Sequence, residues 1–394
     1  MLGKDLNSSP LQYRTWVVPS TPDYDGYYYN GPKSGTTPLG NISAYEITDD
    51  NFVADFNLPN PLSWNSTRIT LPESVSSSQL AVIDGYVYLF GGNDGYGNKI
   101  LRATVDDPTN WVDTGSTLPT NLYGSQLAVI DGYVYLFGGN NGAATDHIYS
   151  APTSNPLSWT DHGALLPQKT YNAQIFIKDG YIYLVGGRGD DSVYDKIYTA
   201  SIFTPLSWTD SNWTLPEPIH SSTLGIVKGT TDGYVCLFGG IKSNGTQSNS
   251  IYGAQIFNLS SWNIYGTLPY AVSSGQFVVV GTYAYLMTVA NNTTSFTYVL
   301  RSSIDSPFVW SDFGFKVPGT VTQSQLAIIN DRLYLFGGNG NSTIFADNPI
   351  YKYTVTDPDA MEYGFVTRTL FDTYGFNNGF RVIGIPPWKT TYVG

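Results

Sequence analysis

The stretch SQLAVIDGYVYLFGG decides the fold of this protein, because it occurs twice without a change, at Ser78–Gly92 and at Ser125–Gly139. Looser copies of the same string follow and end at Gly187, Gly240 and Gly338. A further copy, GQFVVVGTYAYLMT, carries Met287 and Thr288 where the other copies have two glycines. A period of about fifty residues indicates a repeat architecture in which each unit buries its apolar face against its neighbours.

Each copy predicts a β-hairpin that is followed by two more strands. Alternating apolar residues on both sides of Asp84-Gly85 indicate two strands joined by a tight turn. The pair Gly91-Gly92 has no Cβ atoms, so backbones can approach closely or take a positive φ there. An Asn- and Gly-rich loop, the strand KILRATV and a short strand that ends at Leu118-Pro119 complete the unit. We therefore expect four antiparallel strands in each repeat.

Tryptophan recurs with the same period as the glycine pair. The recurring residues are Trp64, Trp111, Trp159, Trp208, Trp262 and Trp310. They lie 47 to 54 residues apart, and most of them follow a proline by three residues. Each indole is either a stacking platform for a sugar or a residue that packs between neighbouring repeats. Regular spacing at one position of the unit favours packing between repeats.

Four-stranded units of this length, repeated radially, are the blades of an all-β β-propeller. The clear hairpins number six, but second halves number seven, because AYEITDD…PLSWNSTRITLP at 44–72 precedes the first clear hairpin. The segment DGYYYNG within Arg14–Gly31 supplies a partner, which favours seven four-stranded blades, with six as the alternative. We predict an N-terminal arm at 1–11, a propeller at 12–372 with repeats of about 47–59 residues, and a C-terminal docking tail at 373–394.

Composition excludes several classes of partner. The formal net charge is −12 and no Lys/Arg cluster occurs, so we expect neither nucleic acid nor an anionic membrane surface as a partner. No apolar run approaches the length of a transmembrane helix, and MLGKDLNSSP lacks the apolar core of a signal peptide. Charged residues make up only 13% of the chain, which suits an extracellular or virion surface.

The order of hydrophobic strand, Asp-Gly turn, YLFGG, Asn-rich loop, third strand and late Trp resembles the kelch repeat over roughly residues 75–365. The phrases PLSWTD and DPTNWVDTG resemble kelch-like propellers of bacteriophage structural proteins. The resemblance implies a non-enzymatic virion protein of a phage-like particle, in the tail as a nozzle, tip or fibre component. It also implies a location in the virion after assembly in the host cytoplasm.

The partners expected from this interpretation are other virion or tail proteins, further copies of the chain as a homo-oligomer, and a host surface glycan. Two alternatives stay open. One is a glycan-binding lectin or adhesin outside the cell, and the other is a glycan-cleaving enzyme.

The sequence predicts no catalytic residue, no cofactor and no metal site. Kelch-like propellers include copper oxidases, which need a His pair, a Tyr pair and a Cys crosslinked to Tyr. Here His147, His162 and His220 share no repeat position, and Cys236 lies in a strand of the buried type. No P-loop, dinucleotide fingerprint, nucleophile elbow or HExxH is present. No motif singles out the carboxylate pair that a glycosidase requires.

The candidate binding residues lie in the loops after the glycine pairs, which vary while the strands repeat. They are Asn93, Asp94, Asn140, Asn141, Arg188, Asp190, Asp191, Asn339 and Asn341. The two ends of the chain carry apolar residues beyond the repeats, and these are candidates for docking on a neighbouring subunit. They are Trp16, Phe380, Ile385 and Trp388.

Overall fold

The computed structural model describes residues 65–93, 97–228, 233–280, 283–290, 296–318, 322–330, 332–338, 349–354 and 382–383. The chain divides into two units, Met1–Asn60 with Thr356–Pro358 and Pro61–Val355 with Asp359–Gly394. All described residues belong to the second unit. The predicted arm, and the docking tail apart from Val382–Ile383, lie outside the described residues.

The first three repeats form three antiparallel four-stranded sheets, as the sequence predicts. The first sheet contains β2 (Gln79–Ile83), β3 (Tyr86–Phe90), β4 (Lys99–Thr104) and β5 (Val112–Thr117). The second contains β6 (Gln126–Ile130), β7 (Tyr133–Phe137), β8 (His147–Pro152) and β9 (Thr160–Ala164). The third contains β10 (Gln174–Lys178), β11 (Tyr181–Val185), β12 (Lys196–Ser201) and β13 (Trp208–Thr214). Strands follow one another in chain order within each sheet.

The fourth and fifth repeats share one long strand. Their strands are β15 (Thr223–Lys228), β16 (Gly233–Phe238), β18 (Ser248–Gln255), β19 (Asn258–Val280), β20 (Tyr283–Ala290), β21 (Phe296–Ser303) and β22 (Ser311–Pro318). The first part of β19 pairs with β18 and its last part pairs with β20. This strand therefore closes one group of four strands and opens the next. A two-stranded sheet of β14 (Ile219–His220) and β17 (Ile241–Lys242) lies beside the fourth repeat in the sequence.

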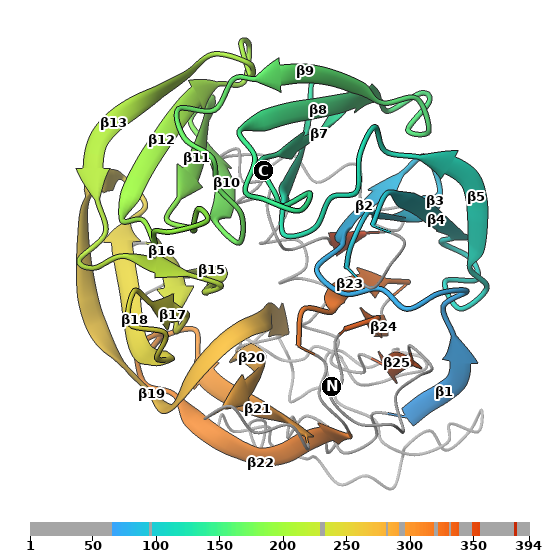
Figure 1. The fold of residues 1–394 in the computed structure, drawn as a ribbon. Helices are drawn as coiled ribbons and strands as arrows, with labels where there is room; N and C mark the ends of the chain where they lie inside the picture. Colours follow the sequence, from blue (N-terminus) through green and yellow to red (C-terminus); the bar gives the residue numbers. More distant parts are fainter. Residues whose placement is uncertain are drawn as a thin grey trace, which may run out of the picture. The chain divides into compact units, whose positions relative to one another are not determined.

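The last sheet combines distant parts of the chain. Its order is β1-β25-β24-β23-β26. The strands are β1 (Asn65–Thr70), β23 (Gln325–Ile329), β24 (Arg332–Phe336), β25 (Pro349–Thr354) and β26 (Val382–Ile383). β1 pairs with β25 in the antiparallel sense, and β26 pairs with β23 in the parallel sense. In Figure 1 the first strands of successive sheets lie toward a common centre, which is a propeller-like arrangement. Within the described ranges there is no helix that could span a membrane.

The Asp-Gly turns have the backbone that the sequence predicts. Asp84 has a φ of 46° and Gly85 a φ of 78°, and the two residues alone separate β2 from β3. Two successive positive φ angles define a type I′ turn, whose twist matches that of the strands it joins. The hairpin prediction is therefore confirmed.

The tryptophans pack between sheets, which confirms the packing interpretation for those that are described. The Trp159 ring meets the Phe90 ring of the preceding sheet edge-on, with centroids 5.1 Å apart. Equivalent contacts join Trp208 to Phe137, Trp310 to Phe238, and Trp111 to Phe336 of the last sheet. The indole N–H of Trp159 donates to the Pro156 carbonyl at 3.0 Å, so the proline three residues earlier satisfies the buried donor.

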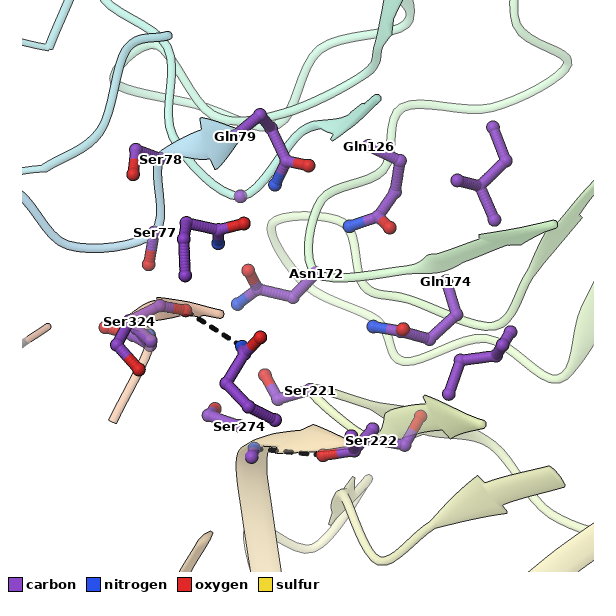
Figure 2. A pocket seen from close by; sticks show the side chains of 18 of the residues that line it. Ser77, Ser78, Gln79, Gln126, Asn172, Gln174, Ser221, Ser222, Ser274 and Ser324 are labelled. Atoms are coloured by element: carbon purple, nitrogen blue, oxygen red, sulfur yellow. Dashed lines mark hydrogen bonds between the residues drawn. The ribbon is translucent and has the colours of Figure 1, made fainter. Parts of the chain in front are cut away.

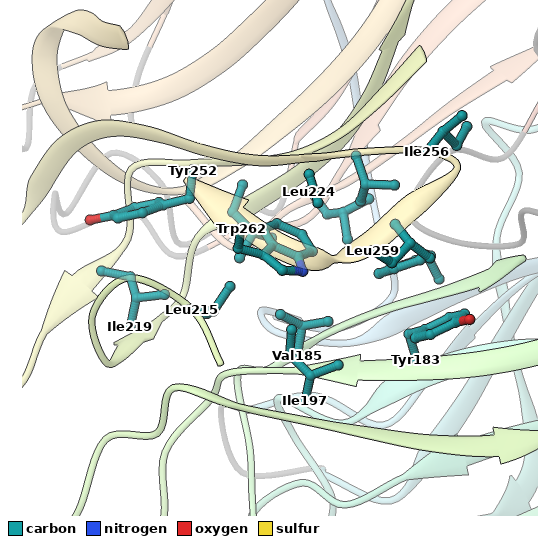
Figure 3. Packing of buried hydrophobic residues seen from close by; sticks show 14 residues of the cluster. Tyr183, Val185, Ile197, Leu215, Ile219, Leu224, Tyr252, Ile256, Leu259 and Trp262 are labelled. Atoms are coloured by element: carbon teal, nitrogen blue, oxygen red, sulfur yellow. The ribbon is translucent and has the colours of Figure 1, made fainter. Parts of the chain in front are cut away.

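Trp262 occupies the same place between the third and fourth repeats. It is buried in one apolar cluster with Val185, which stands where four other repeats have phenylalanine. Figure 3 shows Trp262 facing Val185 and Ile197 across the junction between two sheets. Burial of side chains of this size stabilises each junction by roughly 1.5–3 kcal/mol per residue.

The glycine pairs end strands and connect sheets. The N–H of Gly92 donates to the Leu122 carbonyl at the start of the next repeat, at 2.9 Å. Gly91 has a φ of 64°, and a Cβ there would lie 2.3 Å from the same Leu122 oxygen. No residue with a side chain fits such an approach without a backbone shift. In the fifth repeat Gln276 pairs with Met287 as Gln79 pairs with Phe90 in the first, so Met287 takes the phenylalanine position. Thr288 and Val289 therefore replace the glycines, one residue later than the sequence suggested, and β20 continues through them as a strand of eight residues.

Candidate functional site

Six residues at the starts of the inner strands form a circuit of backbone hydrogen bonds, here called the collar. The collar residues are Ser77, Gly124, Asn172, Ser221, Ser274 and Gln323. Each N–H donates to the carbonyl of the collar residue in the preceding repeat, at 2.7–3.3 Å. The N–H of Ser77 donates to Gln323, so the circuit returns from the first repeat to the last.

Every collar residue has a positive φ, between 52° and 65°. Only one of them is glycine, and non-glycine residues rarely adopt this conformation because the Cβ then crowds the backbone. Backbone strain that the surrounding structure enforces is a feature of functional sites more often than of plain scaffolding. The collar therefore marks the place to look for a site.

A pocket of about 120 Å³ opens inside the collar. Its wall carries one residue per repeat, the first or second residue of each inner strand or of the equivalent part of β19. These wall residues are Gln79, Gln126, Gln174, Thr223, Gln276 and Gln325. Figure 2 shows side chains from successive repeats facing a common space, among them Gln79, Gln126 and Gln174. Leu127, Ile175, Leu224 and Phe277 add apolar surface to the lining.

Among the described residues, the pocket lining is mainly polar and carries no ionisable side chain. Gln126 and Gln174 donate through Nε2 to the carbonyls of Ser125 and Ala173, at 3.0 and 2.8 Å. These bonds fix the amide direction and leave the side-chain oxygen as an acceptor. Gln276 differs, because its Nε2 donates across to the Ser324 carbonyl at 2.8 Å.

One wall hydroxyl is buried without a partner. Ser324 is completely inaccessible, and its Oγ has no hydrogen-bond partner among the described residues. A buried hydroxyl that is left unpaired costs roughly 1–3 kcal/mol. Ser324 lines the pocket and is labelled in Figure 2, but its hydroxyl is closed off from the pocket space.

The residue that directly precedes each collar residue is next to the pocket lining in the chain, and these six residues are here called the mouth. Tyr123, Tyr171 and His220 make up the aromatic half of the mouth, on the second to fourth repeats. Ser76, Ser273 and Thr322 make up the hydroxyl half. The Tyr123 and Tyr171 rings meet edge-on with centroids 6.1 Å apart. The Arg188 guanidinium lies over the Tyr171 ring, 5.4 Å from its centroid.

The mouth holds few charges. Burial, with a smaller contribution from the positive charge of Arg188, lowers the pKa of His220 to about 4, so this imidazole is neutral at pH 7. Burial raises the pKa of Tyr123, which keeps its phenol protonated. The charged residues near the aromatic half include Arg188, Asp190 and Asp191 of one loop and Lys169, two residues before Tyr171.

The structure brings some of the predicted loop residues to the mouth. Asn93, Asn140 and Arg188 each form a backbone bridge to a mouth residue, respectively Ser76, Tyr123 and Tyr171. The loops after the glycine pairs therefore border the pocket, and loop and wall belong to one face.

These loop residues differ in what their side chains do. Asn140 is buried, and its Oδ1 accepts the Gly142 N–H at 2.9 Å, so it stabilises its own loop. Asp190 accepts the Ala144 N–H at 2.8 Å and ties two loops together. Asn141 and Asp191 are exposed.

The remaining predicted residues lie outside the described ranges. They are Asp94, Asn339 and Asn341 of the loops, and Trp16, Phe380, Ile385 and Trp388 of the proposed docking segments.

Sequence reasoning missed the wall residues, although a signal was present. The repeated strings read SQL, SQL, AQI, GQF and SQL, with glutamine at the same position each time. A long polar side chain has no packing reason to recur at a strand position that a propeller turns toward its centre.

Other polar clusters contribute nothing to the pocket. Ser150 Oγ and His162 Nε2 lie 2.8 Å apart, and neither residue lines the pocket. Cys236 is fully buried, which raises the pKa of its thiol. Within the described ranges no three His, Cys, Asp or Glu side chains gather to hold a metal ion.

No family model matches the chain, and no curated protein matches it in sequence.

Proposed function

We propose that this protein is a non-enzymatic recognition propeller that binds an uncharged, polar ligand in the pocket inside the collar. The observation that carries the proposal is the pocket lining, in which amides and hydroxyls from six repeats converge without any ionisable group. Concave sites that combine apolar surface with a few converging polar groups are the usual places for small ligands.

The chemistry of the lining favours a neutral ligand. Glutamine, asparagine and serine side chains offer both donors and acceptors, as the hydroxyls of a polyol do. A charged ligand would lose its hydration here without meeting an opposite charge, which is costly. A single water needs about 10–15 Å³ of such space, so a pocket of about 120 Å³ has room for a ligand larger than a water molecule.

The same lining supports binding rather than catalysis. General acid–base chemistry needs a titratable group within hydrogen-bond reach of the reacting atoms. Glycoside hydrolysis needs two carboxyl groups that flank the scissile bond. The pocket lining offers neither, so the glycan-cleaving alternative would require a different site.

We place this binding role in the host-contacting part of a phage-like tail, as the sequence resemblance suggests. A neutral glycan of the host surface is the ligand that fits both the resemblance to phage propellers and the uncharged, polar lining of the pocket. The assembly role rests on Trp16, Phe380, Ile385 and Trp388, which lie outside the described residues. Light scattering on the isolated chain tests the homo-oligomer part of this role, since a chain that assembles with its own copies should not remain a monomer.

We also propose that the ring has six blades rather than seven. Two observations support six: the collar returns from Gln323 to Ser77 after six bonds, and β1 pairs with β25 as the outer strand of the last sheet. In this arrangement the strand that led to the seven-blade prediction completes the sixth blade. The N-terminal region 12–64, from which a seventh blade would come, lies outside the described residues.

A crosslink distinguishes the two counts. Ser66 and Tyr351 are register partners in β1 and β25, so cysteines at both positions, in a Cys236→Ser background, should form a disulfide on mild oxidation. A shift in mobility after proteolysis between the two sites reports the link. A seven-blade ring would pair β1 with the segment near Arg14–Gly31 and leave these cysteines reduced.

The pocket is tested by shortening its wall. Gln126→Ala and Gln174→Ala should each weaken binding of any neutral ligand found in a glycan screen by about tenfold, because each removes amide hydrogen bonds. Gln255→Ala is the matched control, since Gln255 ends β18 and does not line the pocket. Equal affinity of the Gln126, Gln174 and Gln255 variants would rule out the pocket as the binding site.

A further inference from the structure

We propose that Tyr123, Tyr171 and Arg188 form a stacking subsite for a pyranose ring at the mouth of the pocket, so that the ligand is a neutral saccharide. This inference rests on the proposed function, because it extends the same site outward. It narrows the ligand from any uncharged polar molecule to one that has a flat, apolar sugar face beside its hydroxyls.

The subsite is continuous with the pocket. Tyr123 directly precedes the collar residue Gly124, and Tyr171 directly precedes Asn172, and both collar residues line the pocket. A saccharide with one residue in the pocket would therefore extend past this pair of tyrosines wherever it leaves on that side.

The tyrosines are held in place before any ligand arrives. Tyr123 exchanges two backbone hydrogen bonds with Asn140, at 3.1 and 2.8 Å, and Tyr171 exchanges two with Arg188, at 2.9 and 3.0 Å. The side chain of Asp190 accepts the Ala144 N–H and so fixes one loop against the other. A site whose groups are fixed in this way loses little entropy when it binds.

The side chains match a sugar. Both tyrosines are half-buried, so part of each residue stays accessible, and Arg188 lies over one face of the Tyr171 ring. Aromatic rings supply large contact area together with a polar tip. Arg188 is oriented by its own loop, because Nε donates to the Gly189 carbonyl at 3.2 Å and a terminal nitrogen donates to the Asp190 carbonyl at 3.4 Å. Its other N–H groups remain available for hydroxyl oxygens.

The charges of the loop favour a neutral sugar over an acidic one. Arg188 carries the only positive charge of the loop 188–192, and Asp190 and Asp191 follow it within three residues. An isolated arginine would attract a uronic acid, but two adjacent carboxylates repel it. The hydroxyl half of the mouth offers no ring at any of its three positions, so stacking is confined to one side.

The test compares ring-shaped and linear probes on the whole chain. Saturation-transfer NMR and calorimetry are run with a panel of neutral methyl hexopyranosides and β-linked disaccharides, with sorbitol as a linear polyol and methyl glucuronide as an acidic sugar. We expect a pyranoside or disaccharide to bind, with the strongest saturation on the protons of one sugar face, and sorbitol and the glucuronide to bind at least about tenfold more weakly.

Variants then separate the subsite from the pocket. Tyr171→Leu and Tyr123→Leu keep apolar volume but lose the ring, and each should lower pyranoside affinity by about tenfold and abolish the one-face saturation pattern. Tyr181→Leu is the matched control, because Tyr181 is 51% exposed and starts β11 at the opposite end of the strand hairpin. Arg188→Gln, which keeps donors but removes the charge, serves as a second variant if a tyrosine substitution unfolds the protein.

The outcomes are distinct. Pyranoside binding that depends on Gln126 and Gln174 but not on Tyr123, Tyr171 or Arg188 would overturn the stacking subsite and leave the pocket proposal intact. Preference for sorbitol or for the glucuronide would also overturn it. If no probe in the panel binds, both the pocket proposal and the stacking subsite are wrong.

Discussion

The two halves of the pocket mouth share one backbone and differ in their side chains. On the aromatic half, Tyr123 and Tyr171 precede collar residues with φ angles of 65° and 53°. On the hydroxyl half, Ser273 precedes Ser274, whose φ is also 53°. The hydrogen-bond circuit runs through both halves without a change of pattern. The backbone conformation is therefore repeated around the pocket, while the aromatic side chains are found on one half of the mouth only.

This difference has a physical reason. Glycine pairs hold both halves, since Gly139 donates to Thr170 before Tyr171, and Gly240 donates to Val272 before Ser273. Such bonds involve backbone atoms alone, so they leave the mouth side chains free to vary. A repeat protein can thus change what it recognises at one blade without losing the frame that all blades share.

The largest effect should come from breaking that frame. A Cβ on Gly138 would lie 2.4 Å from the Thr170 oxygen, and one on Gly239 would lie 2.4 Å from the Val272 oxygen, both at φ 60°. We expect Gly138→Ala and Gly239→Ala to lower the free energy of unfolding by similar amounts, about 3–4 kcal/mol. Urea unfolding measures this.

The control for the frame is Gly132→Ala. Gly132 also has a positive φ, 76°, but a Cβ there would meet nothing within 4 Å. Gly132→Ala should lower the free energy of unfolding by only about 1–2 kcal/mol, because only the backbone conformation disfavours the new side chain. A Gly138 variant as stable as the Gly132 variant would contradict the role of the close approach.

The second prediction uses the titratable residue of the aromatic half. The pKa of His220 is about 4 in the folded protein against 6.5 in the unfolded chain, because burial disfavours the charged imidazole. As the pH falls below 6.5, the imidazole takes up a proton in the unfolded chain but stays neutral in the folded protein. The free energy of unfolding therefore decreases as the pH falls from 6.5 to about 4. The full loss is about 3 kcal/mol.

The comparison that isolates this effect is wild type against His220→Asn. Carboxylates that titrate in the same range act on both proteins alike, so the difference in urea-unfolding free energy between pH 7 and pH 4 belongs to His220. An identical pH slope in the two proteins would show that the imidazole is accessible to protons in the folded state.

The third prediction concerns the loops that border the aromatic half. Asp190→Ala removes the acceptor for the buried Ala144 N–H and should destabilise the protein by about 1 kcal/mol. Asp191→Ala should change stability by less than about 0.5 kcal/mol, because that side chain is exposed. If the two substitutions lowered stability equally in thermal or urea unfolding, the Asp190 side chain would not stabilise one loop against the other.

The smallest expected effect is the pH dependence of binding. The described residues of the pocket lining include no ionisable group, His220 is already neutral at pH 7, and the raised pKa keeps the phenol of Tyr123 protonated. Affinity for a neutral pyranoside should therefore change by less than about twofold between pH 6 and pH 8. Calorimetry at several pH values checks this, and a bell-shaped profile would indicate a titrating group at the site.

Much of the fold could be predicted because its determinants are local. The Asp-Gly turn needs two residues with positive φ, and Asp84-Gly85 supplies them within the hairpin itself. The repeated Trp and Phe positions predict packing between units, and the ring contact of Trp159 with Phe90 confirms this packing. The pairing of β1 with β25 was not predicted, because the two strands are about 280 residues apart and no local pattern indicates which distant strands pair.

The candidate site was predicted only in part. Variation after the glycine pairs pointed to Arg188 and Asp190, which do border the mouth. The same reasoning treated the identical strings as scaffold and so passed over Gln126 and Gln174. A residue that recurs in most of the repeats looks structural in the sequence alone, but its copies face one pocket when the repeats are arranged about a common centre.

The sequence by itself determined the strands, their turns and their junctions, since hydrophobic alternation, Asp-Gly turns and glycine pairs act within a few residues or between adjacent repeats. Only the tertiary structure decided that wall residues from six repeats meet in one uncharged pocket and that the aromatic side chains gather on one half of its mouth. Convergence of this kind depends on the angle at which each sheet packs on the next. That angle is fixed by many weak contacts between sheets, which no single stretch of sequence encodes.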